Sequence, residues 1–337
     1  MNRSLCCLLL LLLRAVSGKA AQAQPFLLPT ANHALFEPNG DEKFVAGTIG
    51  KTWTTGLFGC VRSDGWQMHE GLDIKCLQRD PHGEPADSVT ATADGTVVYF
   101  NTKPSLSNYG NYIVLRHNLA GLEIYSLYAH LKKIREDVKI GQGVKAGEPI
   151  ALMGRTTNTR EGISKGRAHV HFELDLMVNE RFPEWYKKTF PDQRNDHGVW
   201  NGQNLLGLDP RLLLEEQRRG TNFNLPDFIR HQTELCRVMV RGTNFPWLKR
   251  YPALVERNPV AEREGAAGYE ISLNYNGVPF RLIPRAASEL GVKARFQLLS
   301  VNEAEYRKNP CRRLIVQRGA HWQLGHNGEK LLELLTY

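Results

Sequence analysis

The chain has no apolar run long enough to cross a lipid bilayer. The longest, residues 5–13, ends at Arg14, whereas a membrane-spanning helix needs about 20 apolar residues. A small-x-small cleavage site follows at Ala21-Gln22-Ala23, as in a signal peptide. We therefore predict that residues 1–23 are a signal peptide. The mature chain should then have no stable membrane insertion and be exported to the periplasm, the cell envelope or the extracellular space.

The excess of one sign of charge over the other is also small. Lys and Arg number 43 against 35 Asp and Glu, which gives a net charge of +8 at pH 7. Loss of residues 1–23 removes three basic residues and no acidic one, and so leaves +5. A mildly basic protein is suited to an anionic polymer such as a cell wall, and an ordinary solvated surface explains the charge equally well. There is no basic stripe interleaved with aromatic residues, so nothing indicates a nucleic-acid partner.

Cysteine is rare, and only four cysteines follow the cleavage site: Cys60, Cys76, Cys236 and Cys311. In an oxidising compartment four cysteines allow three pairings. The local pairing Cys60–Cys76 would brace the loop between them, which leaves Cys236–Cys311 as the second predicted disulfide. Free buried thiols are the alternative.

Helical periodicity is weak between residues 52 and 171, and no alternation of strand and helix indicates a doubly wound sheet. This region instead predicts β structure with glycine-rich turns. The expected strands are a hairpin over 89–100 that turns at Asp94-Gly95, a pair over 112–117 and 122–130, and strands over 149–153 and 168–176. The fold class is thus a mainly β domain, an antiparallel sheet with an open cleft.

Beyond this region the pattern becomes mixed. Asp209-Pro210 is expected to open a helix that runs to residue 218. Later helical pieces at 226–235 and 286–290 alternate with strands at 237–241, 269–275, 280–284 and 313–318. We predict an N-terminal arm over 24–50, a mainly β domain over 51–218 and a small C-terminal α+β module of unknown role over 219–337.

Three short segments gather residues that bind metals and move protons: His69-Glu70-Gly71-Leu72-Asp73, Tyr128-Ala129-His130 and His169-Val170-His171. Alternate residues of a strand share a face, so His169 and His171 should point the same way. By the same count His130 should lie on the face of Tyr128. We expect one sheet face to collect these histidines in a cleft.

Imidazole nitrogens and carboxylate oxygens are good zinc ligands, and further unliganded histidines beside a metal act as general acids or bases. A lone histidine in a strand is usually structural. Seven histidines show no such grouping, and we interpret them as structural or surface residues: His33, His82, His117, His197, His231, His321 and His326.

Several segments, in this order, resemble the lysostaphin-type family of zinc metalloendopeptidases, which cut the peptide part of bacterial peptidoglycan. The resemblance covers about residues 54–213 and implies that the domain over 51–218 is a zinc metallopeptidase domain. It rests on the segments at 58–62, 69–74, 91–97, 109–112, 128–131 and 169–173, with the glycine-rich stretch before Met153-Gly154.

The resemblance implies that His69, Asp73 and His171 bind Zn²⁺ and that His130 and His169 are the catalytic pair. A zinc-activated water would attack the scissile carbonyl of a peptidoglycan peptide. Arg62 and Glu70 are weaker candidates for substrate contact. Glu70 lacks the His-Glu-x-x-His helix that would make it a general base, and a surface salt bridge explains Arg62 as well.

Other readings remain open from the residues alone. The chain could be a catalytically silent wall-binding protein or an activator of another cell-wall hydrolase, with a regulatory protein partner. A zinc amidase acting at the sugar–peptide junction would use similar ligands. A biotinyl or lipoyl carrier is disfavoured because no exposed lysine is flanked by methionines.

Overall fold

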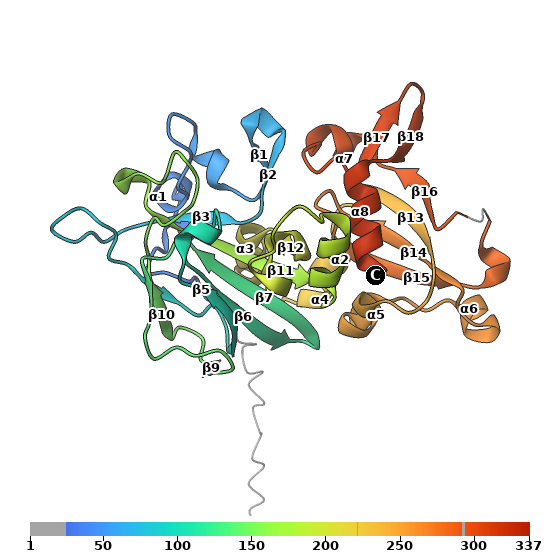
Figure 1. The fold of residues 1–337 in the computed structure, drawn as a ribbon, viewed down its shortest axis with the longest axis horizontal. Coiled ribbons are helices and arrows are strands. Elements are labelled where there is room, and N and C mark those ends of the chain that lie inside the picture. Colours follow the sequence, from blue (N-terminus) through green and yellow to red (C-terminus); the bar gives the residue numbers. More distant parts are fainter. Residues whose placement is uncertain (1–24, 221, 292–293) are drawn as a thin grey trace, which may run out of the picture.

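The computed structural model describes residues 25–220, 222–291 and 294–337, so the predicted signal peptide lies outside the described residues. A seven-stranded antiparallel sheet, in the order β12-β11-β7-β6-β5-β9 with β3 also paired to β11, occupies the first part of the chain (Figure 1). Its strands are β3 (Leu72–Lys75), β5 (Gly95–Asn101), β6 (Tyr112–Leu119), β7 (Leu122–Ala129), β9 (Gly143–Val144), β11 (His169–Met177) and β12 (Leu205–Leu208). The predicted mainly β, antiparallel fold class is confirmed.

Two smaller sheets flank this one. One is the hairpin of β1 (Gly59–Arg62) and β2 (Gln67–His69). The other has the order β4-β10-β8, with β4 (Ser88–Thr90), β8 (Lys133–Ile134) and β10 (Pro149–Leu152).

The predicted hairpin over residues 89–100 is wrong. β4 pairs with β10 and β5 pairs with β6 and β9, so the two strands that flank Asp94-Gly95 belong to different sheets. The predicted pair over 112–117 and 122–130 is the hairpin β6–β7. Its turn uses Ala120 and Gly121, both at positive φ (52° and 78°), the geometry of a tight two-residue hairpin turn.

The helices of the first part are short: α1 (Asp41–Phe44), α2 (Phe182–Thr189) and α3 (Pro210–Arg219). α3 begins where Asp209 and Pro210 predict, because the Asp209 side chain accepts a hydrogen bond from the backbone N–H of Leu212. Single 3-10 turns occur at Ala34–Phe36, Trp53–Gly56, Ser63–Gly65, Pro104–Leu106, Lys165–Arg167, Gly198–Trp200 and Gly202–Asn204. Within the described ranges, no helix combines the length and the apolar composition that a membrane span requires.

The last third of the chain forms a four-stranded antiparallel sheet, β15-β14-β13-β16, and a separate hairpin, β17–β18. The strands are β13 (Cys236–Arg241), β14 (Gly268–Leu273), β15 (Pro279–Arg285), β16 (Phe296–Val301), β17 (Ile315–Arg318) and β18 (His321–Leu324). The helices are α4 (Leu225–Arg230), α5 (Pro246–Arg250), α6 (Pro259–Glu264), α7 (Glu303–Lys308) and α8 (His326–Leu335), with 3-10 turns at Pro252–Leu254 and Ala287–Glu289. The α+β character is confirmed, although the predicted helix over 226–235 ends at Arg230, and β16 and α8 were not predicted.

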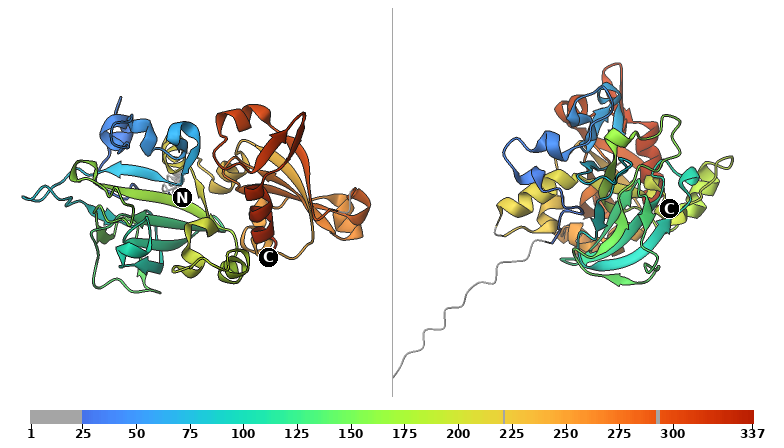
Figure 2. Two further views of the ribbon diagram at one scale, coloured as in Figure 1. Left: turned by 45° about the horizontal axis from the view of Figure 1, so that its top comes forward. Right: turned by 90° about the vertical axis from the view of Figure 1, so that its left-hand side faces the viewer.

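The C-terminal module packs against the first part instead of hanging from a linker (Figure 2). One hydrophobic cluster includes buried residues of both, among them Leu176 of β11 and Leu334 of α8. Polar contacts cross the same boundary: the Tyr251 hydroxyl accepts a hydrogen bond from the Met177 N–H, and the Asn179 amide donates to the Leu334 carbonyl. Both bonds are buried, so the two parts are held in a fixed relation.

Both predicted disulfides are wrong. The structure joins Cys60 to Cys311 across 251 residues, and leaves Cys76 and Cys236 as thiols. The Cys76 thiol donates a hydrogen bond to the Asp87 carboxylate, and Cys236 is fully buried in β13. The local pairing fails because β1 carries Cys60 to the boundary with the C-terminal module, where Cys311 meets it.

Replacing both Cys60 and Cys311 by Ser should lower the free energy of unfolding by about 2–5 kcal/mol, as loss of a native disulfide commonly does. Urea denaturation followed by circular dichroism measures the change. Cys76→Ser is the control, because a serine hydroxyl can keep the hydrogen bond to Asp87. Equal destabilisation by Cys76→Ser, or a Cys60–Cys76 peptide in a non-reducing digest, would contradict this pairing.

Candidate metal centre

β11 is the strand on which the site is built. All nine of its residues are buried, because β3 and β12 pair along one of its edges and β7 along the other. Its apolar residues alternate with four ionisable ones on the opposite face: His169, His171, Glu173 and Asp175. Burying so many ionisable groups is costly unless they bind something or one another.

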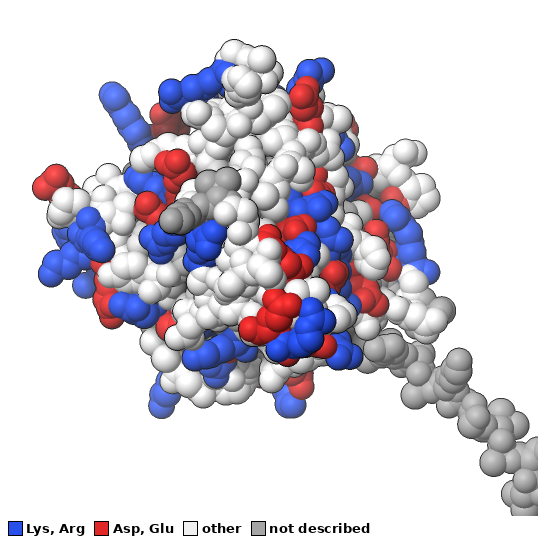
Figure 3. All heavy atoms as spheres, turned by 90° about the vertical axis from the view of Figure 1, so that its right-hand side faces the viewer, with Lys and Arg blue, Asp and Glu red and all other residues white. Residues whose placement is uncertain are grey.

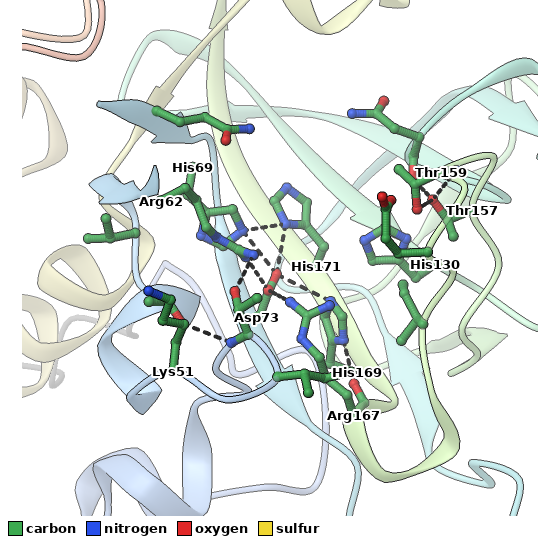
Figure 4. A pocket seen from close by; sticks show the side chains of 18 of the residues that line it. Lys51, Arg62, His69, Asp73, His130, Thr157, Thr159, Arg167, His169 and His171 are labelled. Atoms are coloured by element: carbon green, nitrogen blue, oxygen red, sulfur yellow. Dashed lines mark hydrogen bonds and ion pairs between the residues drawn. The ribbon is translucent and has the colours of Figure 1, made fainter. Parts of the chain in front are cut away.

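Asp73, His69 and His171 bring three ligand atoms together on this face (Figure 4). Asp73 lies directly opposite His171 in the β3–β11 ladder. Its Oδ1 is 3.1 Å from His69 Nε2 and 2.9 Å from His171 Nδ1, and the two ring nitrogens are 3.1 Å apart. All three side chains are buried. The sequence predicted this set, and the fold brings all three residues together.

The outer atoms of the three ligands are all occupied. His69 Nδ1 donates to the Leu57 carbonyl at 2.6 Å, and His171 Nε2 donates to Glu173 Oε1 at 2.7 Å. The second carboxylate oxygen of Asp73 accepts from Arg62 at 2.7 Å and from Arg167 at 3.1 Å. Such contacts orient metal ligands and fix their tautomers. Arg62, a candidate for substrate contact, therefore holds Asp73 in this structure.

The donor set fits a zinc ion. Two imidazole nitrogens and one carboxylate oxygen are the ligands of many catalytic zinc sites, with a fourth position left for water. The surroundings also favour positive charge at this point. Burial lowers the pKa of His171, but hydrogen bonds to Asp73 and Glu173 outweigh burial and raise that pKa to about 10. Metal binding would displace the proton that these carboxylates attract.

Gly71 allows β2 and β3 to approach β11 closely enough to form the cluster. A Cβ at this position would lie 2.5 Å from the Phe172 carbonyl oxygen and 2.9 Å from both Glu173 Cγ and His171 Nε2. The glycine between His69 and Asp73 is thus required by packing.

We expect Gly71→Ala to lower the free energy of unfolding by about 1–3 kcal/mol, the usual cost of an overpacked site, and to weaken zinc binding by displacing His171. Thermal unfolding with and without zinc measures both effects. Gly166→Ala is the matched control, since nothing lies within 4 Å of its added Cβ. Equal zinc affinity in the two variants would rule out this role for Gly71.

His130 faces the cleft because of a backbone turn that the alternation of residues along the strand did not predict. Ala129, not Tyr128, lies opposite His171 in the β7–β11 ladder, so strand parity alone would turn His130 to the other face. The strand ends at Ala129, and His130 has φ 59°, the left-handed region that a histidine adopts rarely. This turn sets its ring 4.9 Å from that of His169, centroid to centroid.

His130 and His169 each use Nδ1 to donate to a backbone carbonyl, that of Thr156 at 2.9 Å and that of Arg167 at 2.7 Å. Each ring therefore keeps Nε2 as an acceptor. For His169 this atom lies 3.4 Å from Asp73 Oδ1. Burial lowers the pKa of His169 to about 4, and burial together with the nearby His169 and His171 holds the pKa of His130 well below its usual range. Both rings are neutral at pH 7 and able to take up a proton.

A comparison with known proteins matches the part of the chain in which these residues lie. The family model described as peptidase family M23 matches residues 67–182, the segment that carries all five residues. This segment is an M23 peptidase domain.

Three curated relatives match parts of the chain. An uncharacterized metalloprotease of Haemophilus influenzae is 40% identical over 108 residues, 32% of this chain and 18% of that protein. The murein hydrolase activator NlpD of Escherichia coli is 38% identical over 106 residues, 32% of this chain and 22% of that protein. The peptidoglycan DD-endopeptidase ShyB of Vibrio cholerae is 39% identical over 124 residues, 36% of this chain and 24% of that protein. The chain thus spans less than a quarter of each of these relatives.

The M23 domain contains a further polar residue to which the sequence analysis gave no role. The Tyr109 ring lies 5.6 Å from that of His171, and burial, reinforced by the negative charge of Glu173, raises the Tyr109 pKa well above its usual value. Burial, followed by the charge of Glu173, likewise raises the pKa of Asp175. Tyr109 was present in one of the segments that carry the family resemblance, but its contact with β11 depends on tertiary structure.

A cavity of about 640 Å³ opens over the metal ligands of the M23 domain. Residues of two loops line its rim, including Thr157, Thr159 and Glu161 from the polar segment that precedes β11. Glu70 also lines it, and the carbonyl of Glu70 approaches the position of Gly207. The cavity is large enough for a short stretch of peptide to pass over the ligands.

Proposed function

We propose that this protein is an exported zinc metalloendopeptidase that hydrolyses peptide bonds in the stem peptides or cross-links of bacterial peptidoglycan. The observation that carries the proposal is the arrangement of five residues. His69, Asp73 and His171 converge on one point, and two neutral histidines outside that set lie beside it. A catalytically silent relative has no need for the second pair.

His69, Asp73 and His171 would hold the zinc ion. Zinc at such a site supplies Lewis acidity, which activates a water molecule and polarises the scissile carbonyl. The protein supplies the proton transfers: Nε2 of His130 or His169 accepts the proton of the attacking water, and the leaving amine is then protonated. The ring that has taken the proton then has an Nε2–H, which stabilises the oxyanion by a hydrogen bond before the proton passes to the leaving amine.

The cleft groups are pre-positioned for these roles. Because Thr156 and Arg167 carbonyls hold the Nδ1–H groups, neither ring can turn its acceptor nitrogen away from the cavity without losing a hydrogen bond. Arg62 and Arg167 keep the charge of Asp73 fixed. Little reorganisation is then needed when substrate binds, which favours catalysis.

The test uses the mature chain, residues 24–337, incubated with purified peptidoglycan with and without a chelator. We expect soluble peptides with new amino termini, lost on chelation and restored by zinc, with mass spectrometry identifying the bond. Release at the sugar–peptide junction would indicate an amidase instead. Intact wall that still co-sediments with the protein would overturn the hydrolase proposal.

A second candidate is an activator of another cell-wall hydrolase, favoured by the 38% identity with the murein hydrolase activator NlpD over 106 residues. This function would not need the acid–base pair. It predicts that mature protein stimulates a separate wall amidase in the same assay, and that His169→Ala stimulates it equally well.

A further inference from the structure

A second cavity continues from the one over the metal ligands. It has a volume of about 580 Å³ and is bounded on one side by β2 and on the other by the C-terminal module, from Cys311 to Leu334. Four residues line both cavities: Gln67, Met68, Glu70 and Asn108. The two cavities therefore meet, and a chain bound over the ligands can extend toward the C-terminal module.

The second cavity carries a net positive charge. Its charged lining residues are Glu70, Arg312 and Lys330. Arg312 forms no ion pair with a carboxylate among residues 25–220, 222–291 and 294–337, although Glu70 attracts it at longer range. Burial lowers the pKa of Arg312. A half-buried guanidinium without a close partner is available to a ligand carboxylate.

This charge is local. On the face of the C-terminal module shown in Figure 3, Lys and Arg lie among Asp and Glu over the whole visible surface. No broad patch of one sign is seen on the part of this face that the structure describes. The positive charge of the second cavity comes from Arg312 and Lys330, and this cavity adjoins the one over His69, Asp73 and His171.

The fold fixes Arg312 relative to the metal ligands. The neighbouring Cys311 is bonded to Cys60 in β1, and β1 pairs with β2, which ends at the ligand His69. The Arg312 carbonyl also accepts a hydrogen bond from the Asn327 amide at 2.9 Å. The Arg312 backbone is thus tied to both parts of the protein.

We propose that the second cavity is a subsite for a carboxylate-bearing part of the substrate peptide, and that Arg312 binds that carboxylate. A guanidinium binds a carboxylate through two parallel hydrogen bonds, which gives specificity as well as affinity. Trp66, 57% exposed and also lining this cavity, offers an aromatic surface at its edge. The C-terminal module would then select the substrate. This inference rests on the proposed function for the identity of the peptide.

The experiment measures binding separately from hydrolysis. The zinc-loaded mature chain carrying His169→Ala is titrated in a calorimeter with a synthetic stem tetrapeptide that has free carboxylates, and with the same peptide as its carboxamides. We expect the carboxylate peptide to bind roughly tenfold more tightly, equivalent to about 1.4 kcal/mol. Adding Arg312→Gln should remove that difference and leave carboxamide binding unchanged.

Arg318→Gln is the matched control. Arg318 is exposed on β17 of the same module, and its substitution changes the net charge by the same amount as Arg312→Gln. Equal binding of the two peptides by the parent protein would overturn the proposal without any Arg312 variant. An equal loss of affinity for both peptides in a folded Arg312→Gln protein would also overturn the proposal. If the wild-type chain releases nothing from peptidoglycan but Arg312 still discriminates between the peptides, the hydrolase proposal fails and the subsite stands.

Discussion

Asp73→Asn should release the metal and abolish hydrolysis while the chain stays folded. The amide keeps the shape of the carboxylate but loses the negative charge that Asp73 presents to three histidines and two arginines. Substituting an outer partner of a metal ligand typically weakens metal binding 10–100-fold, so we expect at least about a hundredfold loss for a ligand itself. Zinc content after dialysis and the rate of peptide release measure the two effects.

The control is Asp137→Asn, which removes an exposed carboxylate that pairs with Arg135. It should keep one zinc per chain and full activity. Retention of a full equivalent of zinc by Asp73→Asn, at unchanged affinity, would show that the metal is held elsewhere. Asp73→Ala is less informative, because it would also leave Arg62 and Arg167 partly buried without their common partner.

The sequence predicted that His69, Asp73 and His171 come together, because local spacing determines most of their geometry. His169 and His171 share a face by the two-residue period of a strand. Asp73 follows His69 through a glycine that allows a close turn, and the β3–β11 ladder then sets it opposite His171. Only this last pairing required long-range information, and the family resemblance implied it.

The position of His130 was predicted for the wrong reason. Counting along the strand assumed that β7 continues through residue 130, whereas the backbone leaves the strand at Ala129 and turns to positive φ. No residue in Tyr128-Ala129-His130 predicts this change, because even histidine, which is enriched at positive φ, adopts that conformation only in a small minority of cases. The hydrogen bond from the His130 N–H to the Tyr109 carbonyl, which helps to hold the turn, joins segments 21 residues apart.

The disulfide and the second cavity could not be predicted, for a related physical reason. Cysteine positions constrain the number of pairings but not which cysteines meet. Cys60 and Cys311 become neighbours only after the C-terminal module packs against the first part, through contacts such as those of Tyr251 and Asn179. The place of Arg312 beside the metal-site cavity is a consequence of the same packing.

His130→Ala and His169→Ala should each lower kcat/KM by about 10²–10⁴, the range of general acid–base catalysis, without loss of zinc. Neither residue belongs to the His69–Asp73–His171 set, and each ring uses Nδ1 for a backbone carbonyl, which leaves Nε2 to accept a proton. The double variant should lose less than the product of the two single effects, because the two rings serve the same proton transfers. Rates on a defined peptide and zinc content together separate catalysis from metal binding.

His321→Ala is the control, since His321 is exposed on β18, and it should change neither zinc content nor rate. The pattern across variants decides between the two candidate functions. An endopeptidase loses activity in both cleft variants while zinc remains bound. If either cleft variant keeps the full rate of peptide release, the proton-transfer role of that residue is excluded. If the wild type releases nothing and all variants stimulate a wall amidase equally, the activator function replaces the hydrolase.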